Sequence, residues 1–586
     1  MKNYQFDPSK YELDLLNILQ DIEANANITG KKLTQILKKH PKDNGLFAKD
    51  ELVQGYYYLK AKGELSSENN LLAKIKLKPT RSISGVLPLT VLTKPFPCPG
   101  RCIFCPNDIR MPKSYLSDEP GAQRAERNNF DPYLQTYNRL LAFHNTGHKV
   151  AKIELIILGG TWSYYPEAYQ IWFILRCFEA LNDFGNQDHR DEVATVNLFK
   201  KDEKSKSQFS ATGRRRSYNE LVTEINTKSK KKVTETGTWE DLHAAQSQNE
   251  TAQARCVGLV IETRPDHISE QEVIRVRKLG ATKTQVGFQS LNDEVLKLNN
   301  RGHDVAATIR SVSLLRSAGF KIHAHWMPNL YGSNVELDKK DYLKLFTPSF
   351  QPDELKIYPC SLIETAELMD YYNQGKWKPY NREELLDILT FSIANTPRHV
   401  RLTRIIRDIP STDIVVGNKT TNFRQIAEEH LQKANITMLD IRSREIKSQE
   451  VSLKDLVLKE TSYQAENIYG PVTEKFLEFT TADDKICGFL RISLPVQTNT
   501  HFIPELANSA IIREVHVYGV AQTLGEKVKD SSQHLGLGTK LIDRAKLIAK
   551  TNGYPSLAVI SSIGTKEYYR KQQFRDGKYY QHYQLL

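Results

Sequence analysis

Short apolar runs alternate with longer amphipathic stretches between about residues 85 and 400. The apolar runs predict strands at Gly85–Leu92, Ile153–Leu158, Val257–Ile261, Lys283–Val286, Lys321–His325 and Glu354–Ile357. The amphipathic stretches predict helices at Pro132–Asn145, Pro166–Phe184, Glu270–Leu279, Ala306–Ala318 and Asp338–Thr347. Because strands that alternate with helices form parallel sheets, we expect an α/β fold with a partial β/α barrel, open on one side. Its ligand site should lie at the carboxyl ends of the strands.

The patterning divides the rest of the chain into four further segments. Residues 1–80 are predicted to be helical and basic. Residues 185–250 are polar with weak periodicity, which predicts a partly disordered insertion within the barrel segment 81–400. Residues 401–462 are mixed and charged, as in a connector. Residues 463–586 predict a separate mixed α/β unit, with helices after Gly538 and Gly564 and strands at Lys485–Pro495, Ala510–Tyr518, Ser556–Ser561 and Tyr579–Leu585.

The chain of 586 residues carries a net charge of +12, from 81 Lys and Arg against 69 Asp and Glu. Such a balance favours a polyanionic partner without proving one. The stretch 200–232 accounts for +7, from eight Lys and three Arg against four acids, and we interpret it as a solvated segment. No long apolar run and no secretory signal occur, so we expect a cytoplasmic protein without a membrane span.

Segment 54–81 interleaves three consecutive tyrosines with cations. Tyr56, Tyr57 and Tyr58 precede Lys60, Lys62, Lys74, Lys76, Lys78 and Arg81. Aromatic rings among cations can stack on bases while the cations hold phosphates. The alternative is a small helical domain whose tyrosines pack its own core, and the segment by itself favours neither interpretation.

Three of the seven cysteines fall within eight residues, in PFPCPGRCIFCP at 95–106. Cys98, Cys102 and Cys105 have the spacing Cys-x3-Cys-x2-Cys, directly after the first predicted strand. Three thiolates can hold three irons of a [4Fe–4S] cube, and the open fourth iron can chelate the amino and carboxylate groups of S-adenosylmethionine. A zinc site would need a fourth ligand, usually from a second Cys pair, and no second pair follows. The loop therefore predicts both cofactors.

Small and polar residues stand at the ends of three other predicted strands. Gly159 and Gly160 follow one strand, Glu262 ends another, and Gln289 lies just beyond a third. Bare glycine backbone can approach a ligand closely. Because the carboxyl ends of parallel strands meet at one mouth of a barrel, we expect these four residues to bind S-adenosylmethionine.

The segment QHLGLG at 533–538 precedes a stretch, 539–552, that predicts a helix. A turn of this kind presents backbone N–H groups and the helix dipole to a pyrophosphate. The order of strand, glycine turn, helix, strand and tyrosine-bearing helix resembles the GNAT acetyltransferase fold, which implies acetyl-CoA. The residues expected to hold it are Glu514, Val515, His516 and Val517 on the strand, Gln533, Gly536, Leu537, Gly538 and Thr539 at the turn, and Tyr568 and Tyr569 on the last helix.

Taken together, these motifs resemble the catalytic subunit of Elongator, a radical S-adenosylmethionine family that joins such a barrel to a GNAT domain. The resemblance runs from about Lys78 to the carboxyl terminus, apart from the insertion. Besides the cysteine loop and QHLGLG, the segments that carry it are KPTRSISG (78–85), YLQT (133–136), IETRPD (261–266), NRGH (300–303), RDIP (407–410), RSRE (442–445), REVHVYG (513–519) and YYRK (568–571).

The resemblance implies a tRNA-modifying acyltransferase. In the family's proposed reaction, a 5′-deoxyadenosyl radical takes hydrogen from the acetyl methyl group of acetyl-CoA. The carbon radical adds to C5 of the wobble uridine in the anticodon stem-loop, and thioester hydrolysis leaves 5-carboxymethyluridine. The family pattern implies catalytic, acetyl-CoA-binding roles for Lys152 and Tyr569. It further implies tRNA binding by residues 1–80, an external electron donor, and Elongator-like partners or a homo-oligomer.

The chain departs from the family pattern at three places and leaves the cofactor motifs intact. The insertion is longer than expected, MPNLY at 327–331 replaces the usual MPDLP, and Gln573 stands where the family has a Gly before its aromatic residue.

Two other functions fit parts of the sequence. A protein lysine acetyltransferase would use a carboxylate such as Glu514 to deprotonate an amine, with a structural cluster, but such a role does not require an open iron. A tRNA-binding scaffold would leave two cofactor motifs without a purpose.

Because a carbon radical cannot survive transit through water, we also expect the barrel mouth, with Lys152 near its rim, to face the acyl-CoA cleft of residues 514–569.

Overall fold

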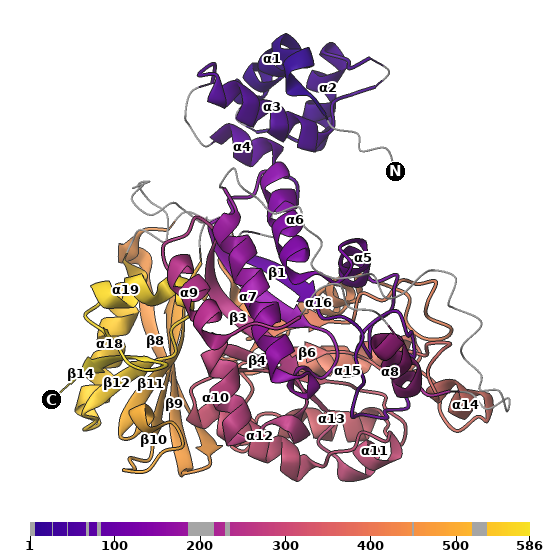
Figure 1. Ribbon diagram of the computed structural model, residues 1–586, viewed down its shortest axis with the longest axis vertical. Coiled ribbons are helices and arrows are strands. Elements are labelled where there is room, and N and C mark those ends of the chain that lie inside the picture. The colour runs from indigo at the N-terminus through magenta and orange to yellow at the C-terminus, as the bar shows by residue number, and fades with distance from the viewer. Residues whose placement is uncertain are drawn as a thin grey trace.

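The computed structural model describes residues 6–585 except 26, 44, 66–69, 79–81, 83, 186–215, 229–234, 448–450 and 519–535. Three units follow one another along the chain: a small group of helices, a barrel of parallel strands wrapped by helices, and a mixed sheet at the carboxyl end (Figure 1). No helix in the described part of the chain is long and apolar enough to cross a membrane.

The amino-terminal unit packs four α-helices round one apolar core, α1 (Glu12–Glu23), α2 (Gly30–Lys39), α3 (Lys49–Ala61) and α4 (Asn70–Ile75), after a 3-10 turn at Pro8–Tyr11. Tyr56 lies in this core, 1% exposed. The Tyr57 ring stacks on His144 of the barrel unit with 4.3 Å between centroids, and the Tyr58 hydroxyl donates to Glu12 at 3.0 Å. All three tyrosines therefore pack within the protein, as the core-packing alternative expected, and their placement does not support base stacking.

Seven parallel strands form the barrel sheet in chain order, β1 (Leu87–Leu92), β2 (Lys152–Leu158), β3 (Arg255–Thr263), β4 (Lys283–Gln289), β5 (Lys321–Trp326), β6 (Glu354–Ile357) and β7 (Arg401–Ile405). β1 and β7 are the two edges, so the barrel is open between them. Six strands confirm the sequence prediction. The seventh lies in the expected connector, so the barrel sheet continues past residue 400. It was missed because Arg401 and Arg404 interrupt its apolar pattern.

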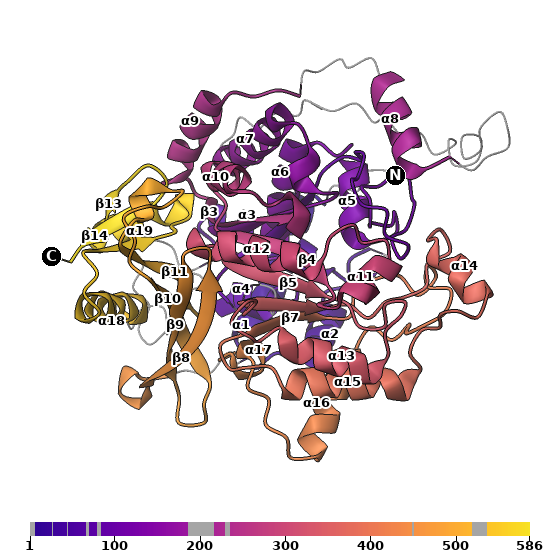
Figure 2. The same cartoon turned by 90° about the horizontal axis from the view of Figure 1, so that it is seen from below.

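Helices lie between successive strands in the chain and after β7, and most of them pack round the outside of the sheet (Figure 2). They are α5 (Pro120–Arg127), α6 (Pro132–Asn145), α7 (Glu167–Asp183), α8 (Tyr218–Lys228), α9 (Trp239–Asn249), α10 (Glu270–Lys278), α11 (Asp293–Leu298), α12 (Val305–Ser317), α13 (Val335–Lys344), α14 (Leu368–Asn373), α15 (Arg382–Ala394), α16 (Phe423–Lys433) and α17 (Ile441–Arg444). Side-chain caps fix several starts. Asp131 accepts from the Leu134 N–H, Ser269 from Glu272, and Asn334 starts α13 three residues before the predicted position.

Part of the segment expected as an insertion packs against the barrel. α9 runs along α7, and the fully buried Asn249 donates to the Asn182 carboxamide and accepts from the Cys256 N–H, both at 2.8 Å. α9 was missed because its sequence, WEDLHAAQSQN, is polar. The disorder expected for the segment falls on residues 186–215 and 229–234, which lie outside the described residues.

The carboxyl-terminal unit is a seven-stranded sheet in the order β13-β14-β12-β11-β10-β9-β8. Its strands are β8 (Val457–Asn467), β9 (Gly470–Thr480), β10 (Ile486–Pro495), β11 (Ser509–Val517), β12 (Ser556–Val559), β13 (Arg575–Asp576) and β14 (Gln581–Gln584), with helices α18 (Leu537–Thr551) and α19 (Lys566–Lys571). Only β11 and β12 pair in parallel. β8 begins at Val457, before the expected boundary, and its half-exposed residues hid it in the sequence.

Buried ion pairs join the barrel to this sheet. Arg513 on β11 donates to both carboxylate oxygens of Asp353, at 2.8 and 2.6 Å, and to the Phe320 carbonyl at 2.8 Å. Arg513 and Arg316 share Glu474, at 3.2 and 3.1 Å, and all four charged side chains are fully buried. Because Phe320 and Asp353 directly precede β5 and β6, the carboxyl-terminal sheet docks at the amino-terminal ends of the barrel strands.

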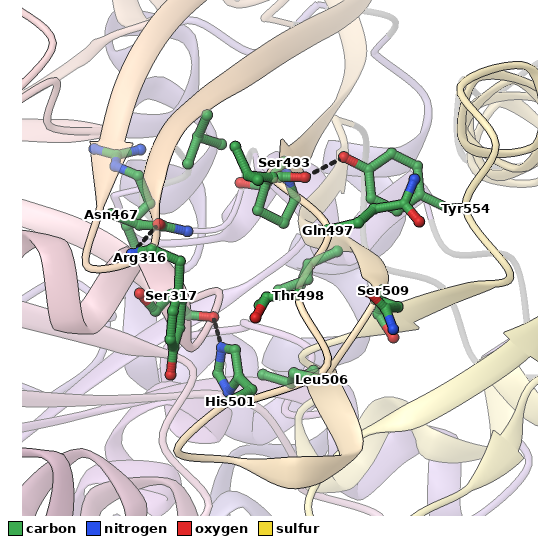
Figure 3. A pocket seen from close by; sticks show the side chains of 16 residues that line it. Arg316, Ser317, Asn467, Ser493, Gln497, Thr498, His501, Leu506, Ser509 and Tyr554 are labelled. Carbon is green, nitrogen blue, oxygen red and sulfur yellow. Dashed lines mark hydrogen bonds between the residues drawn. The ribbon is translucent and has the colours of Figure 1, made fainter.

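A crevice in the same interface lies between α12 and strands β10 and β11 (Figure 3). The His501 ring faces the Ser317 carbonyl at 3.2 Å, and the Tyr554 hydroxyl donates to the Pro495 carbonyl. Its volume of about 10 Å³ has room for about one water. We therefore regard this crevice as a packing seam.

Two candidate sites at opposite ends of the barrel

The cysteine loop lies at the carboxyl ends of β2, β3 and β4, where it forms what we call the sulfur pocket. Cys98, Cys102 and Cys105 all line this pocket. The four residues expected to bind S-adenosylmethionine line it too, namely Gly159, Gly160, Glu262 and Gln289. The structure thus brings together every residue that the sequence placed at this site.

Two guanidinium groups flank the central cysteine. The Cys102 sulfur lies 3.5 Å from Arg301 Nη1 and 4.0 Å from Arg264 Nη1. A hydrogen bond with Cys105, together with these two charges, holds the pKa of Cys102 well below its ordinary value. The thiolate is the form that binds metal. The environment of Cys102 therefore suits a cluster ligand.

The backbone beside the sulfurs leaves no room for side chains. A Cβ at Gly159, where φ is 148°, would lie 1.9 Å from the Thr93 hydroxyl, and one at Gly100 would lie 2.2 Å from Arg264 Nη1. Gln289 has a φ of 67°, and its Oε1 atom is buried without a hydrogen-bond partner in the described part of the chain. Close glycine backbone and a free acceptor are what the amino group of a bound S-adenosylmethionine would need.

In the described ranges, no group of three or more His, Cys, Asp or Glu side chains is arranged round a single metal ion. A [4Fe–4S] cube does not need three ligands round one ion, since each thiolate binds a different iron. The three cysteines on one tight loop fit that requirement.

Several residues of the sulfur pocket were missed by sequence reasoning. The Asn219 side chain on α8 accepts from the Cys98 N–H at 2.9 Å and donates to the Cys98 carbonyl at 2.8 Å. The Ser114 hydroxyl lies 3.3 Å from the Cys105 sulfur. Arg264 and Arg301 fall within two of the segments that carry the family resemblance, and these segments could have identified them as site residues. Asn219 lies in the polar insertion, where the sequence offers no signal.

A second, larger cavity of about 1190 Å³ lies between the barrel and the carboxyl-terminal sheet. Residues near the amino-terminal ends of the barrel strands line one side, Pro88, Glu154, Gly258, Lys283, Lys321, Glu354 and Arg401. The predicted acyl-CoA residues Glu514, Val515, His516 and Tyr569 line the other side. We call this space the large cavity.

The strand in the large cavity has unpaired backbone on one side. β11 pairs with β12 only from Ser509 to Ile512, so the described strands offer residues 513–516 no partner there. An extended ligand can add to such an edge. Lys321 and Arg491 hold the Glu514 carboxylate, and the His516 ring stacks on Phe489 at 5.7 Å. This edge has the form expected for an acyl-pantetheine arm.

The glycine turn lies at the start of α18. Gly536 has a φ of 67°, and a Cβ at Gly538 would lie 2.5 Å from the Tyr568 hydroxyl. Leu537 is fully buried in the core of the sheet, whereas Thr539 is partly exposed. Gln533 lies outside the described residues. Among the remaining predicted residues, Val517 packs against the same core, and Lys152 lies two residues before the cavity-lining Glu154 on β2 without lining the cavity.

The expectation that the barrel mouth faces the acyl-CoA cleft is wrong. The sulfur pocket lies at the carboxyl ends of the strands and the large cavity at their amino ends. The reason is the buried clamp of Arg513 on Asp353, which docks the carboxyl-terminal sheet below β5 and β6. Any coupling between the two sites must therefore run through the barrel interior.

Comparisons with known proteins show the family. The model of the Radical SAM superfamily matches residues 182–339, and that of the Radical_SAM C-terminal domain matches residues 352–433. The tRNA uridine(34) acetyltransferase of Methanocaldococcus infernus is 36% identical over 521 residues, which is 86% of each chain. Elongator complex protein 3 of Danio rerio is 30% identical over 593 residues, covering 98% of this chain and 97% of that protein.

A solved structure is also similar to this chain. The structure of archaeal Methanocaldococcus infernus Elp3 with residues 1–46 deleted matches it with a TM-score of 0.65 and 33% identity, and the match covers 86% of this chain and 100% of that one. The chain belongs to the family of radical S-adenosylmethionine acyltransferases that includes Elongator complex protein 3 and the tRNA uridine(34) acetyltransferases.

Proposed function

We propose that this protein attaches the methyl carbon of acetyl-CoA to C5 of the wobble uridine of tRNA, giving 5-carboxymethyluridine. The observation that carries the proposal is that one barrel holds two cavities. The sulfur pocket is lined by the three cysteines, and the large cavity is lined by residues expected to bind acetyl-CoA. The relatives' names supply the substrate, tRNA uridine 34. In the net reaction S-adenosylmethionine is the two-electron oxidant and ends as methionine and 5′-deoxyadenosine. One methyl hydrogen goes to the 5′-deoxyadenosine, the uridine C5 hydrogen leaves as a proton, and water cleaves the thioester.

In this proposal the sulfur pocket generates the radical. Cys98, Cys102 and Cys105 would hold the [4Fe–4S] cluster, and Gly159, Gly160, Glu262 and Gln289 would hold S-adenosylmethionine. When bound, these groups supply a 5′-deoxyadenosyl radical that takes hydrogen from carbon. Arg264 and Arg301 stabilise the anionic thiolate side of the site, and Asn219 fixes the backbone of Cys98. An external donor supplies the electron.

The acyl group would bind in the large cavity. Residues Glu514 to Val517 of β11 take the pantetheine arm, along the edge that β12 leaves open beside residues 514–516, and the turn at residues 536–539 takes the pyrophosphate, in the manner of a GNAT domain. Tyr569 is 7% exposed and reaches the cavity, and burial raises the pKa of its hydroxyl. It therefore stays protonated and can donate to the thioester oxygen. Lys152, at the start of β2 and two residues before the cavity-lining Glu154, keeps the acetyl-CoA-binding role that the family pattern implies.

The charge of the large cavity suits a polyanion. Nine cations line it, Lys283, Lys321, Arg401, Arg404, Arg424, Arg442, Lys447, Lys485 and Arg513. Five carboxylates oppose them, Glu154, Glu354, Glu428, Glu445 and Glu514. The excess of cations favours RNA phosphates as well as those of coenzyme A. In this proposal residues 1–80 add affinity for tRNA through their lysines, since the tyrosines pack within the protein.

The lysine acetyltransferase alternative depends on Glu514 as a base. Burial alone would raise the pKa of Glu514. The charges of Lys321 and Arg491 nevertheless lower this pKa below its ordinary value. A carboxylate held by two cations is a weak proton acceptor. The geometry therefore favours an acyl-binding role for the strand over deprotonation of an amine.

The test is mass analysis of wobble uridine. Reconstituted protein is incubated without oxygen with tRNA, S-adenosylmethionine, acetyl-CoA and a reductant. We expect 5-carboxymethyluridine at position 34, carrying heavy carbon when the acetyl methyl group is labelled. Modified uridine without the label, or none with any tRNA, would overturn the proposal. Acetylation of a lysine peptide in the same mixture would support the alternative.

A further inference from the structure

The two cavities lie close together inside the barrel. On β4, Lys283 lines the large cavity and Gly287 lines the sulfur pocket, so Gln285 is the one residue between them on that face. On β3, Gly258 and Glu262 line the two cavities in the same way. Four residues of strand span about 13 Å. One layer of side chains therefore separates the two cavities along these strands.

On β4, β5 and β6 this layer is polar, whereas β3 contributes Val260. Ordinary β/α barrels are filled with branched apolar side chains. Both the Lys356 ammonium on β6 and His325 Nε2 on β5 contact Gln285 Oε1, the latter at 3.0 Å. His325 Nδ1 lies 3.6 Å from a carboxylate oxygen of Glu262 in the sulfur pocket. We call Gln285, His325 and Lys356 the lumen triad.

The charge in the triad has an unusual environment. In the part of the chain that the structure describes, no carboxylate oxygen lies within ion-pair distance of Lys356. Burial lowers its pKa to about 8. The charged groups that face it are Glu262 on β3, Lys283 on β4, Arg404 on β7 and Glu354 on its own strand. A cation buried without an ion pair is costly, and such costs are typical of functional sites.

We propose that the lumen triad is the binding site for the uracil ring of the substrate nucleotide. This inference rests on the proposed function and adds the place where the base binds. The base would enter from the large cavity and stop beside the sulfur pocket, where its C5 carbon can meet the activated methyl group. The triad would then hold the reacting base as well as separate the two cavities.

The chemistry of the triad matches the edge of uracil. Lys356 offers N–H donors to the ring carbonyl O4, and Gln285 Oε1, once released by Lys356, accepts from N3–H. Cytosine presents the opposite pattern, with an amino donor at C4 and an acceptor at N3. Two donors would then face each other. The triad therefore selects uracil over cytosine.

The first experiment maps the contact on the intact holoenzyme. An anticodon stem-loop RNA with 4-thiouridine at the wobble position is bound, irradiated and digested, and crosslinked peptides are identified by mass spectrometry. We expect crosslinks in β4 or β6, within residues 283–289 or 354–358. Crosslinks confined to the amino-terminal helices or to the surface would overturn the assignment. The result requires no turnover.

The second experiment removes the charge. Lys356→Met keeps the length of the side chain, and Lys340→Met makes the same change at an exposed position on α13. We expect Lys356→Met to lower the crosslink yield about tenfold, as for one lost charge-assisted hydrogen bond. It should also reduce the preference for uridine over cytidine at the wobble position. Lys340→Met should change neither.

The outcomes separate the two proposals. Iron content and the unfolding midpoint check that each variant is folded, and the wild-type crosslink map stands without any variant. If wild-type protein forms 5-carboxymethyluridine but Lys356→Met keeps both its crosslink yield and its base preference, the triad assignment is wrong and the function stands. If wild-type protein modifies no uridine, the function itself is wrong.

Discussion

The sulfur pocket and the large cavity differ in how the chain builds them. The sulfur pocket rests on one short loop, with its three cysteines between Cys98 and Cys105, directly after the first strand of the barrel. The large cavity draws its walls from both sheets, between residues 84 and 569. A site made by one loop can be recognised in sequence, whereas a site made by docking two sheets exists only once they are packed.

The two sites also differ in what holds them. At the sulfur pocket, two hydrogen bonds between the Asn219 side chain and the Cys98 backbone, together with close glycine contacts, set the loop. At the large cavity, the buried cluster of Arg316, Asp353, Glu474 and Arg513 fixes one sheet against the other. Changes at one site should therefore leave the other intact, except where they weaken the docking itself.

The largest expected effect is at the sulfur pocket. Cys102→Ala should remove the cluster, so that iron falls from about four atoms per chain to near zero. S-adenosylmethionine cleavage should be lost with it, while acetyl-CoA binding stays normal because the large cavity is built by other segments. Iron assay and calorimetry measure the two. Cys487→Ala, in the other sheet, is the matched control, and full cleavage by Cys102→Ala would sink the assignment of the pocket.

The next effect tests the docking. Asp353→Asn should destabilise the fold by about 3–5 kcal/mol, the usual cost of breaking a buried ion pair from one side. Arg513 and Arg491 would lose a fully buried carboxylate partner. Chemical unfolding measures the change. The surface pair of Lys339 and Asp387 offers the control, because Asp387→Asn should cost about 1 kcal/mol or less. Equal costs for the two variants would show that the buried cluster does not hold the sheets together.

A smaller effect is expected at the large cavity. Tyr569→Phe removes one hydroxyl and keeps the ring, so acetyl-CoA hydrolysis and uridine modification should fall about tenfold, the value of one hydrogen bond. Iron content and tRNA affinity should stay unchanged. Modification at the normal rate would leave Tyr569 a packing residue. Tyr583→Phe, at the edge of the same sheet, is the control.

The smallest effect concerns pH. Because burial lowers the pKa of Lys356 to about 8, its ammonium is present below that pH and is lost as the pH rises through it. The specificity constant for tRNA should fall a few-fold across this range, as charge-assisted hydrogen bonds become neutral ones. Lys356→Met should be lower throughout and lack this inflection. A wild-type profile that is flat through pH 8 would contradict a role for this charge.

Local patterns predicted much of this protein. Six of the seven barrel strands, the cysteine loop and the strand-end residues Gly159, Gly160, Glu262 and Gln289 followed from periodicity and short motifs. The sequence prediction missed β7 because its arginines face a cavity, and it missed α9 because two of the four buried residues of that helix, Gln246 and Asn249, are polar. Both exceptions have one cause. The sequence prediction places polar side chains in solvent, whereas in the folded protein tertiary partners satisfy their hydrogen bonds.

By itself the sequence determined the chemistry available to the protein. The spacing of three cysteines and the glycine turn before α18 are short-range features. Each can be recognised from residues that are adjacent in the sequence. The tertiary structure alone decided where that chemistry meets. The Arg513–Asp353 clamp, made by residues 160 positions apart, places strand β11 at the amino ends of the barrel strands. That placement depends on burial and charge pairing between distant segments, which no local pattern encodes.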